Sequence, residues 1–213
     1  MTLTSDDLAE VGRQLDALLD TSAATSEYRP RYNIAPTDPH WIVLPRQGGR
    51  VLTPARWGLK TSKNPAVINV RAETAARRFR EAMAERRCLV PADGFYEWTG
   101  PAGARRPIWF HAPDRRILAM AGFYDLDRDG VLRFTILTTE PAKEIAPIHD
   151  RMPVVLPGDA FERWLAVGAA DLLVPSPPGF LVGTPANPRV NSVQHDDPAC
   201  LDPPDEKGQL DLL

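Results

Sequence analysis

The segment RCLVPADGFYEW, residues 87–98, decides the fold because it holds two strand-like runs joined by a turn. Residues 88–90 are apolar throughout, and residues 94–98 are rich in aromatic side chains, a composition that β-strands favour. Similar runs, separated by turn residues, occur at 41–45, 51–57, 66–70, 108–111, 117–124, 132–138 and 154–156. Because strands and helices do not alternate regularly, the sequence predicts an α+β domain with mostly antiparallel strands.

Helices are few and short in this prediction. Apolar residues at helical spacing predict helices over 5–19 and 73–86, with shorter ones over 141–146 and 158–166. Proline supplies 22 of the 213 residues, and proline is not tolerated inside helices. The sequence therefore excludes a long helical bundle and predicts peripheral helices around a β-rich core.

The composition is typical of a soluble globular protein, with 43% hydrophobic and 25% charged residues. No apolar run approaches the roughly 18 residues of a membrane span, and the N-terminus has no secretory pattern. Two cysteines, Cys88 and Cys200, provide neither a disulfide framework nor metal-ligand spacing. We therefore expect a cytoplasmic protein with no metal, no cofactor and no membrane partner.

Positive charge is concentrated in one segment of an acidic chain. The formal net charge is -3, yet residues 71–87 carry six arginines against three glutamates. The local distribution of charge matters more for nucleic-acid binding than the total. We expect this basic segment to face nucleic acid.

Four polar residues interrupt apolar, strand-like runs: Asn69, Glu97, Thr138 and His149. Burial between Tyr and Trp would raise the pKa of Glu97, and a nearby histidine would complete an acid–base pair. The structural alternative makes Glu97 an exposed strand residue and His149 a turn residue. Cys88 also has two interpretations, a small buried side chain or a protease nucleophile with His149 as its base.

Seven sequence blocks resemble one known family. In chain order they are RYNIAP (31–36), WGL (57–59), INVRAET (68–74), RCLVPADGFYEW (87–98), LTTE (137–140), PIHDRMP (147–153) and VNSV (190–193). Together they resemble the SOS response-associated peptidase (SRAP) family, the proteins that crosslink to abasic sites in DNA. The blocks cover roughly residues 30–195.

The resemblance implies one compact domain, over residues 1–200, with a barrel-like β core beside a basic groove for single-stranded DNA. In the family, removal of the initiator methionine exposes a cysteine. Its amine and thiol react with the aldehyde of the abasic sugar and form a reversible thiazolidine crosslink.

The resemblance also assigns roles to residues of this chain. Asn69, Glu97 and His149 match the family's other active-site positions. The residues implied in DNA binding are Asn33, Arg71, Thr138 and Arg151. Apart from the resemblance, the chemistry of the side chains makes Arg77 and Arg87 further candidates for contacts with phosphates, and Trp57 and Trp98 candidates for stacking on bases.

The sequence departs from the family at its start. Family members begin Met-Cys-Gly-Arg, followed by Phe or Tyr, whereas this chain begins Met1-Thr2-Leu3. Three interpretations are open: a start assigned too far downstream, a variant that binds lesions without crosslinking, and an imine formed by the amine of Thr2. After Trp57, the family's Pro-x-Trp is also absent.

Residues 201–213 are rich in Pro, Asp and Gly and predict a flexible tail. The tail ends in residues that resemble the bacterial sliding-clamp binding peptide, namely Gln209, Leu210, Leu212 and Leu213. Such a peptide docks its apolar side chains into a preformed groove; the alternative is a chance leucine-rich end. The sequence thus predicts two partners, abasic single-stranded DNA and a sliding clamp, for a nucleoid-associated protein.

Overall fold

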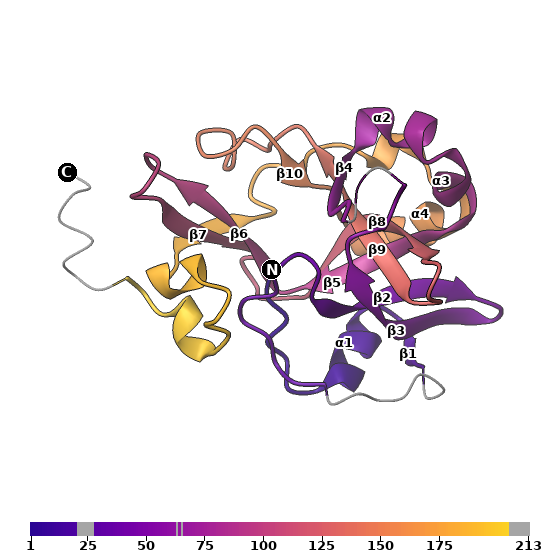
Figure 1. The fold of residues 1–213 in the computed structure, drawn as a ribbon, viewed down its shortest axis with the longest axis horizontal. Helices are drawn as coiled ribbons and strands as arrows, with labels where there is room; N and C mark the ends of the chain where they lie inside the picture. The colour runs from indigo at the N-terminus through magenta and orange to yellow at the C-terminus, as the bar shows by residue number, and fades with distance from the viewer. Residues whose placement is uncertain (21–27, 63, 65, 205–213) are drawn as a thin grey trace.

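Five strands close into a barrel in the computed structural model, which describes residues 1–20, 28–62, 64 and 66–204 (Figure 1). They are β2 (Pro39–Arg46), β3 (Gly49–Trp57), β5 (Arg87–Ala92), β8 (Leu118–Leu126) and β9 (Leu132–Thr139). Antiparallel pairs join β3 to β2, β2 to β5, β5 to β8 and β8 to β9. A parallel pairing of β3 with β9, at Trp57 and Phe134, closes the ring. The predicted barrel-like, mostly antiparallel α+β domain is confirmed.

Short strands extend the barrel sheet on either side of β9. β4 (Asn69–Arg71) lies parallel to β9, and β10 (Met152–Pro153) pairs with β9 in the antiparallel sense. Thr138 of β9 is therefore flanked by Arg71 on one side and Pro153 on the other. Elsewhere β1 (Leu18–Leu19) lies parallel to β3, and β11 (Val155–Leu156) pairs with β8.

A second, smaller sheet is ordered β12–β7–β6 and lies to the left of the barrel in Figure 1. Its strands are β6 (Gly94–Thr99), β7 (Arg106–His111) and β12 (Val182–Pro185). The segment 87–98 runs from the barrel into this sheet, with Gly94 at the junction. A Cβ at Gly94 would lie 2.4 Å from the Phe110 carbonyl oxygen, so only glycine permits this close approach.

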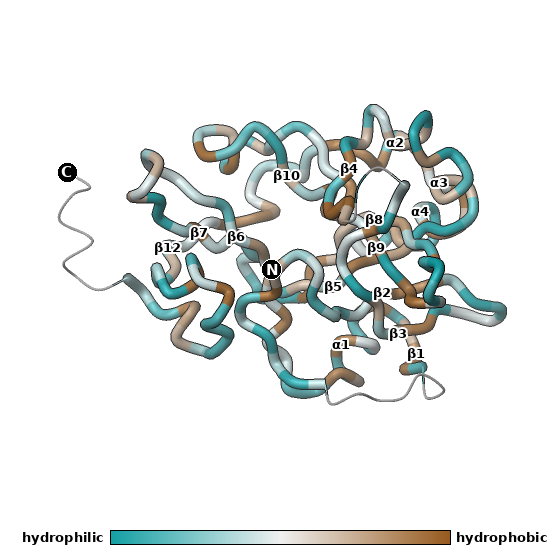
Figure 2. The backbone as a smooth tube through the Cα atoms, in the orientation of Figure 1, coloured by the Kyte–Doolittle hydropathy of each residue, from teal (hydrophilic) through white to brown (hydrophobic). Residues whose placement is uncertain are grey.

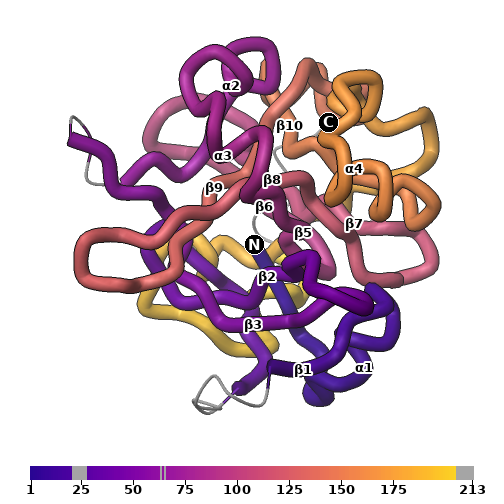
Figure 3. The backbone as a smooth tube through the Cα atoms, turned by 90° about the vertical axis from the view of Figure 1, so that its right-hand side faces the viewer, coloured from indigo at the N-terminus to yellow at the C-terminus, as the bar shows by residue number. Residues whose placement is uncertain are grey.

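The beginning of the chain is held against β6. The Thr2 N–H donates to the Gly94 carbonyl at 3.0 Å, and the Asp93 N–H donates to the Thr2 carbonyl at 3.0 Å. Thr2 is fully buried, and its hydroxyl accepts a hydrogen bond from Trp109 Nε1 at 3.1 Å. Figures 1 and 3 accordingly place the N-terminus near the middle of the molecule.

The helices lie outside the barrel and are short. The α-helices are α1 (Leu8–Gln14), α2 (Ala72–Arg78), α3 (Arg80–Glu85) and α4 (Phe161–Val167). The 3-10 helices are η1 (Gly158–Ala160), η2 (Ala170–Leu172), η3 (Pro188–Asn191) and η4 (Pro198–Leu201). Within the described part of the chain, no helix has the length and apolar character needed to cross a bilayer.

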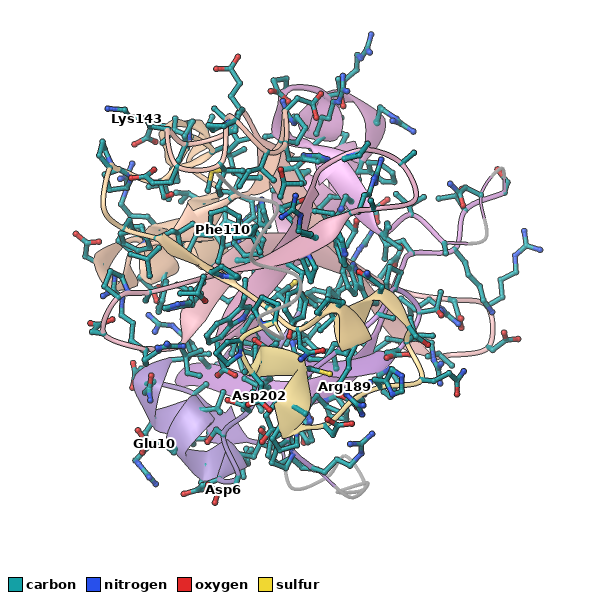
Figure 4. All side chains as sticks on the ribbon, turned by 90° about the vertical axis from the view of Figure 1, so that its left-hand side faces the viewer. Asp6, Glu10, Phe110, Lys143, Arg189 and Asp202 are labelled. Atoms are coloured by element: carbon teal, nitrogen blue, oxygen red, sulfur yellow. The ribbon has the colours of Figure 1, made fainter. Side chains whose placement is uncertain are left out.

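The main hydrophobic core fills the barrel and continues under the small sheet. Leu89, Met120 and Phe134 are fully buried, and Phe110 lies among closely packed side chains in the middle of Figure 4. In the same view, Asp6, Glu10 and Lys143 point outward. Figure 2 shows the corresponding pattern, with hydrophobic stretches in the barrel strands and hydrophilic loops around them.

Helix boundaries differ most from the prediction. The helix predicted over 5–19 ends at Gln14, because Asp16 takes a left-handed conformation with φ of 51° and the next residues form β1. The helix predicted over 73–86 is broken at Phe79, whose φ and ψ of -131° and 46° are not helical. Residues 143–148 form turns and residues 141–142 have no regular structure, so the helix predicted over 141–146 was wrong.

Strand boundaries differ less. The strand predicted over 66–70 is shortened to β4, which begins at Asn69 and runs one residue further to Arg71. The strand predicted over 154–156 corresponds to β11, and Val154 lies outside it. The sequence did not predict β12, which contains a glycine and a proline that both disfavour strands.

Candidate functional site

One pocket with a volume of about 250 Å³ brings together side chains from distant parts of the chain. It is lined by Asn69, Arg71, Glu97, Thr138, His149, Arg151, Met152 and Pro153. Six of the seven residues that the sequence assigned to the site lie here. The pocket forms where β4, β9 and β10 of the barrel sheet approach β6 of the small sheet.

The polar wall of the pocket comes from β4 and β9. Asn69 and Arg71 share one face of β4, since side chains two apart in a strand point the same way, whereas Val70 between them is buried. Arg71 lies opposite Thr138 in the parallel pairing of β4 with β9. Arg71 is exposed, and no ion pair between described residues involves it. Its charge is therefore available to an anionic ligand.

Glu97 enters the pocket from β6 and is partly buried. Burial raises the pKa of the Glu97 carboxyl, the nearby His149 charge opposes this, and the Asp150 carboxylate adds to it. A carboxyl with a raised pKa keeps its proton closer to neutrality than an exposed one, so Glu97 is suited to donate a proton to a bound ligand.

His149 is held by the backbone of Arg151. The Arg151 N–H donates to His149 Nδ1 at 3.0 Å, and the Arg151 carbonyl oxygen lies 2.9 Å from the same nitrogen. Nδ1 can accept from the N–H, which leaves a proton on Nε2, or donate to the carbonyl, which leaves Nε2 as the acceptor. The ring can thus give or take a proton at Nε2 while Nδ1 stays bound.

The α-amine of Met1 lies close to this pocket without lining it. The amine is buried and donates to the Ile34 carbonyl at 3.0 Å. Burial, helped by the charge of Arg31, lowers the pKa of the amine to about 5, and Glu97 is among the carboxylates that oppose this shift. The first residues of the chain are therefore within electrostatic reach of Glu97.

Comparison with known proteins shows which family the chain belongs to. A family model described as SOS response associated peptidase (SRAP) matches residues 1–193. The chain belongs to the SRAP family.

Curated SRAP relatives of the chain come from bacteria and vertebrates. Abasic site processing protein YoaM of Bacillus subtilis is 34% identical over 160 residues, which cover 69% of this chain and 70% of that protein. YobE of the same organism is 32% identical over 160 residues, covering 69% of this chain and 73% of the relative. Abasic site processing protein HMCES of Gallus gallus is 29% identical over 224 residues, covering 83% and 67%.

Solved structures share the SRAP fold of this chain. A crystal structure of a protein from Bordetella bronchiseptica superposes with a TM-score of 0.70 and 26% identity, covering 86% of this chain and 97% of that one. A protein from Bacteroides thetaiotaomicron superposes with a TM-score of 0.66 and 24% identity, covering 78% and 82%, and shows the same fold.

The side chain of Arg151 is already bonded within the SRAP domain, so it is not free to bind a phosphate. Its guanidinium forms a two-point ion pair with Glu73 of α2, at 2.7 and 2.9 Å, and donates to the Thr138 carbonyl at 2.6 Å. Its positive charge is already balanced, so a DNA contact through this side chain stays a prediction that would require competition with Glu73.

Asn33 does not line the pocket. It is buried, and its side-chain amide donates to the carbonyls of Val190, Ser192 and His195 at 3.0 to 3.2 Å. In this position Asn33 fastens the RYNIAP block to the VNSV block. DNA binding by Asn33 stays a prediction.

Two of the further candidates from the sequence, Arg87 and Trp57, are buried, whereas base stacking by Trp98 stays a prediction. Arg87 is buried and donates to backbone carbonyls at the ends of α3 and α4, so it is not exposed to phosphates. Trp57 is buried and stacked on Phe134, so it offers no free face to a base. Trp98 is partly exposed and donates to the Asn191 side chain at 2.7 Å.

Neither cysteine of the SRAP domain is placed for nucleophilic attack. Cys88 and Cys200 are fully buried, and burial raises the pKa of both thiols. Cys88 is therefore the small buried side chain of the first interpretation, and the interpretation as a cysteine protease finds no support.

Sequence reasoning missed Glu73, Met152 and Pro153, although the first lies in the INVRAET block and the others in the PIHDRMP block. The signal was present in the blocks themselves, but nothing in the spacing of Glu73 and Arg151 predicts their ion pair. The clamp-peptide residues Gln209, Leu210, Leu212 and Leu213 lie outside the described residues.

Proposed function

We propose that this SRAP-family protein recognises abasic sites in single-stranded DNA, with the lesion sugar in the pocket around Glu97. The observation that carries the proposal is the convergence of Asn69, Glu97 and His149 in one pocket. Arg71 lines the same pocket and forms no ion pair with another described residue. A volume of about 250 Å³ is slightly smaller than the usual small-ligand site, which suits a sugar that has lost its base. The names of the curated relatives support the same lesion.

The pocket residues have complementary roles in opening the lesion. An abasic sugar is mostly a closed hemiacetal, and opening it requires a proton to leave the anomeric hydroxyl and another to reach the ring oxygen as the ring C–O bond breaks. Glu97, with its raised pKa, donates to the ring oxygen, while His149 Nε2 takes the hydroxyl proton. Asn69 hydrogen-bonds the sugar, and Arg71 holds an adjacent phosphate.

The opened aldehyde can then react with an amine. The amine adds to the aldehyde carbon, one water leaves, and an imine forms; a neighbouring thiol adds to the imine carbon and closes a thiazolidine. This is the chemistry that the SRAP resemblance implies for an N-terminal cysteine. The alternative function is non-covalent binding of the lesion, which requires only the pocket and the phosphate contacts.

The proposal is tested by fluorescence anisotropy with oligonucleotides that differ at one position. We expect the full chain to bind single-stranded DNA with a stable abasic analogue about tenfold more tightly than the intact strand, or about 1.4 kcal/mol. Arg71→Ala should weaken binding to both strands and reduce the salt slope by about 0.7, the value for one phosphate of a single strand.

Arg80→Ala is the matched control, because Arg80 is also exposed but lies on α3 and does not line the pocket. We expect it to change affinity less than Arg71→Ala. Equal affinity for abasic, intact and duplex DNA would contradict the proposed function.

A further inference from the structure

The side-chain bonds of Arg151 join three segments of the chain around the pocket. Glu73, in the first turn of α2, accepts from Nη1 and Nη2 of Arg151 at 2.7 and 2.9 Å, and Nη2 also donates to the Thr138 carbonyl at 2.6 Å. The Arg151 side chain is only 16% exposed, whereas that of Glu73 is 52% exposed. The arginine is thus fixed in one orientation by α2 and β9 together.

The backbone of Arg151 also holds His149. Both the N–H and the carbonyl of Arg151 lie within 3.0 Å of His149 Nδ1. The chain after Arg151 is fixed by the pairing of Met152 with Thr139. On the other side the His149 side chain is exposed, and its backbone N–H donates to the Ile145 carbonyl at 3.0 Å. The side chain of Arg151 is the contact that ties this turn to α2 and β9.

We propose that Glu73 is a positioning residue for His149: by holding the Arg151 guanidinium it fixes the backbone groups that bind Nδ1. This keeps Nε2 as the ring nitrogen free to exchange a proton with the lesion. The inference rests on the role of His149 in the proposed function. It also explains why the Glu73 carboxylate lies near a pocket proposed to bind DNA, although its negative charge alone would weaken DNA binding.

The charge of Glu73 is essential to this arrangement. The hydrogen bonds from Arg151 lower the pKa of the Glu73 carboxyl, which is therefore ionised at neutral pH. Two parallel N–H to oxygen contacts between a guanidinium and a carboxylate are directional as well as strong. A neutral amide at this position could accept only one of the two bonds and would place an NH₂ group against the other.

Glu73→Gln tests the inference through the nitrogen resonances of His149. We expect the Nδ1 chemical shift of His149 to move, because the hydrogen bond from the Arg151 N–H lengthens, and the Arg151 amide to exchange about tenfold faster, which equals ~1.4 kcal/mol. Glu85→Gln is the matched control, since it removes the same charge from an exposed residue of α3 that does not line the pocket. Glu73→Asp keeps the charge and should return both signals toward the wild type.

Functional readouts separate this inference from the proposed function. The rate at which the protein opens an abasic sugar is measured by trapping the aldehyde that forms. In Glu73→Gln this rate should fall about as much as in His149→Ala. The affinity of Glu73→Gln for intact single strands should stay equal to that of the wild type or rise. Unchanged His149 and Arg151 signals in Glu73→Gln would overturn the inference, even if the protein binds abasic DNA. A wild type without preference for abasic DNA would overturn the proposed function. The His149 and Arg151 signals of Glu73→Gln would still test the inference.

A second substitution tests the inference if Glu73→Gln fails to fold. Arg151→Lys keeps a positive charge but cannot form the two-point contact, so it should give the same changes in the His149 and Arg151 signals. Wild-type signals in a folded Arg151→Lys would equally overturn the inference.

Discussion

Glu97 and its two neighbours on β6 face opposite sides of the strand, one side toward the pocket and the other toward a hydrophobic cluster. On β6 the neighbours of Glu97, Tyr96 and Trp98, pack against the smaller hydrophobic cluster, whereas Glu97 itself points into the pocket. The period of two along a strand produces this separation. A carboxyl is thereby partly removed from water on a rigid strand, and its raised pKa follows from that burial.

The burial of Glu97 predicts a pH-dependent effect on stability. A carboxyl whose pKa is raised by folding binds its proton more tightly in the folded chain, so its ionisation lowers stability as pH rises from the unfolded value of about 4.3 through the folded one. Glu97→Gln should therefore melt at a higher temperature than the wild type at neutral pH, and the difference should disappear in acid. Melting curves across this pH range, with exposed Glu85→Gln for comparison, measure it. A Glu97→Gln protein less stable than the wild type at neutral pH would refute this account.

The candidate site was predictable from the sequence where a polar residue interrupts an apolar strand. Asn69, Glu97 and Thr138 were recognisable in this way, and the SRAP resemblance supplied the connection between them. Asn33 and Arg151 show the limit of such reasoning. A sequence shows that a polar side chain is present, but whether it contacts backbone carbonyls, a carboxylate or the ligand depends on residues more than 75 positions away.

Among the secondary-structure elements, α3 and α4 depend on one buried arginine. Arg87 of β5 donates to the carbonyls of Met83 and Ala84 at 2.5 and 2.6 Å, and to those of Trp164, Leu165 and Ala166 at 2.8 to 3.0 Å. The last carbonyls of a helix have no partner within the helix. One guanidinium therefore satisfies two helix ends and attaches both helices to the barrel.

Removal of this arginine should cost stability without affecting the site. Arg87→Met would leave the carbonyls of two helix ends without their donor, and we expect a loss of about 3 kcal/mol. Urea denaturation measures the loss, and DNA affinity of the folded variant should be unchanged because Arg87 does not line the pocket. Exposed Arg80→Met should lose much less. An Arg87→Met protein of wild-type stability that binds DNA more weakly would place Arg87 in the binding surface after all.

The strands of the barrel were more predictable than the helices. The apolar runs that became β2, β5, β8 and β9 are buried in the core, so their pattern follows directly from packing. Helical periodicity over 73–86 could not reveal the break at Phe79, where the chain turns so that the Phe79 ring packs on Phe123. The strand β12 exists because β7 offers it an edge, which is information from outside its own sequence.

At the scale of the whole molecule, the barrel and the small sheet meet where the chain begins. Thr2 is bonded to Gly94 at the start of β6, and Glu97 lies three residues further along that strand. Because the Thr2 N–H is buried and bonded to a carbonyl, Thr2 is poorly placed to attack a lesion in the pocket. A nucleophile carried by residues placed before Thr2 would start from the Gly94 end of β6, three residues from Glu97 along the strand.

This geometry predicts the effect of supplying the family's nucleophile. Insertion of Cys-Gly-Arg-Tyr between Met1 and Thr2 should give a protein that, after methionine removal, forms an SDS-stable adduct with abasic single-stranded DNA without a reductant. The same insertion with Ser in place of Cys should form no heat-stable adduct, and Glu97→Gln should slow both methionine removal and crosslinking in the extended protein. Gel electrophoresis of these three proteins and of the chain without the insertion measures adduct formation. A stable adduct formed by the chain without the insertion would point to a different nucleophile.

Under the proposed function, the pocket around Glu97 and His149 binds the abasic site. Titration of ¹⁵N-labelled protein with abasic single-stranded DNA tests it most directly, because each backbone amide reports separately. We predict that the largest shift changes fall on Asn69, Arg71, Glu97, Thr138 and His149, and that an intact strand of the same length leaves Glu97 and His149 almost unaffected. Changes centred instead on the apolar groove beside Ile108 and Pro185, or identical changes with abasic and intact strands, would contradict the account.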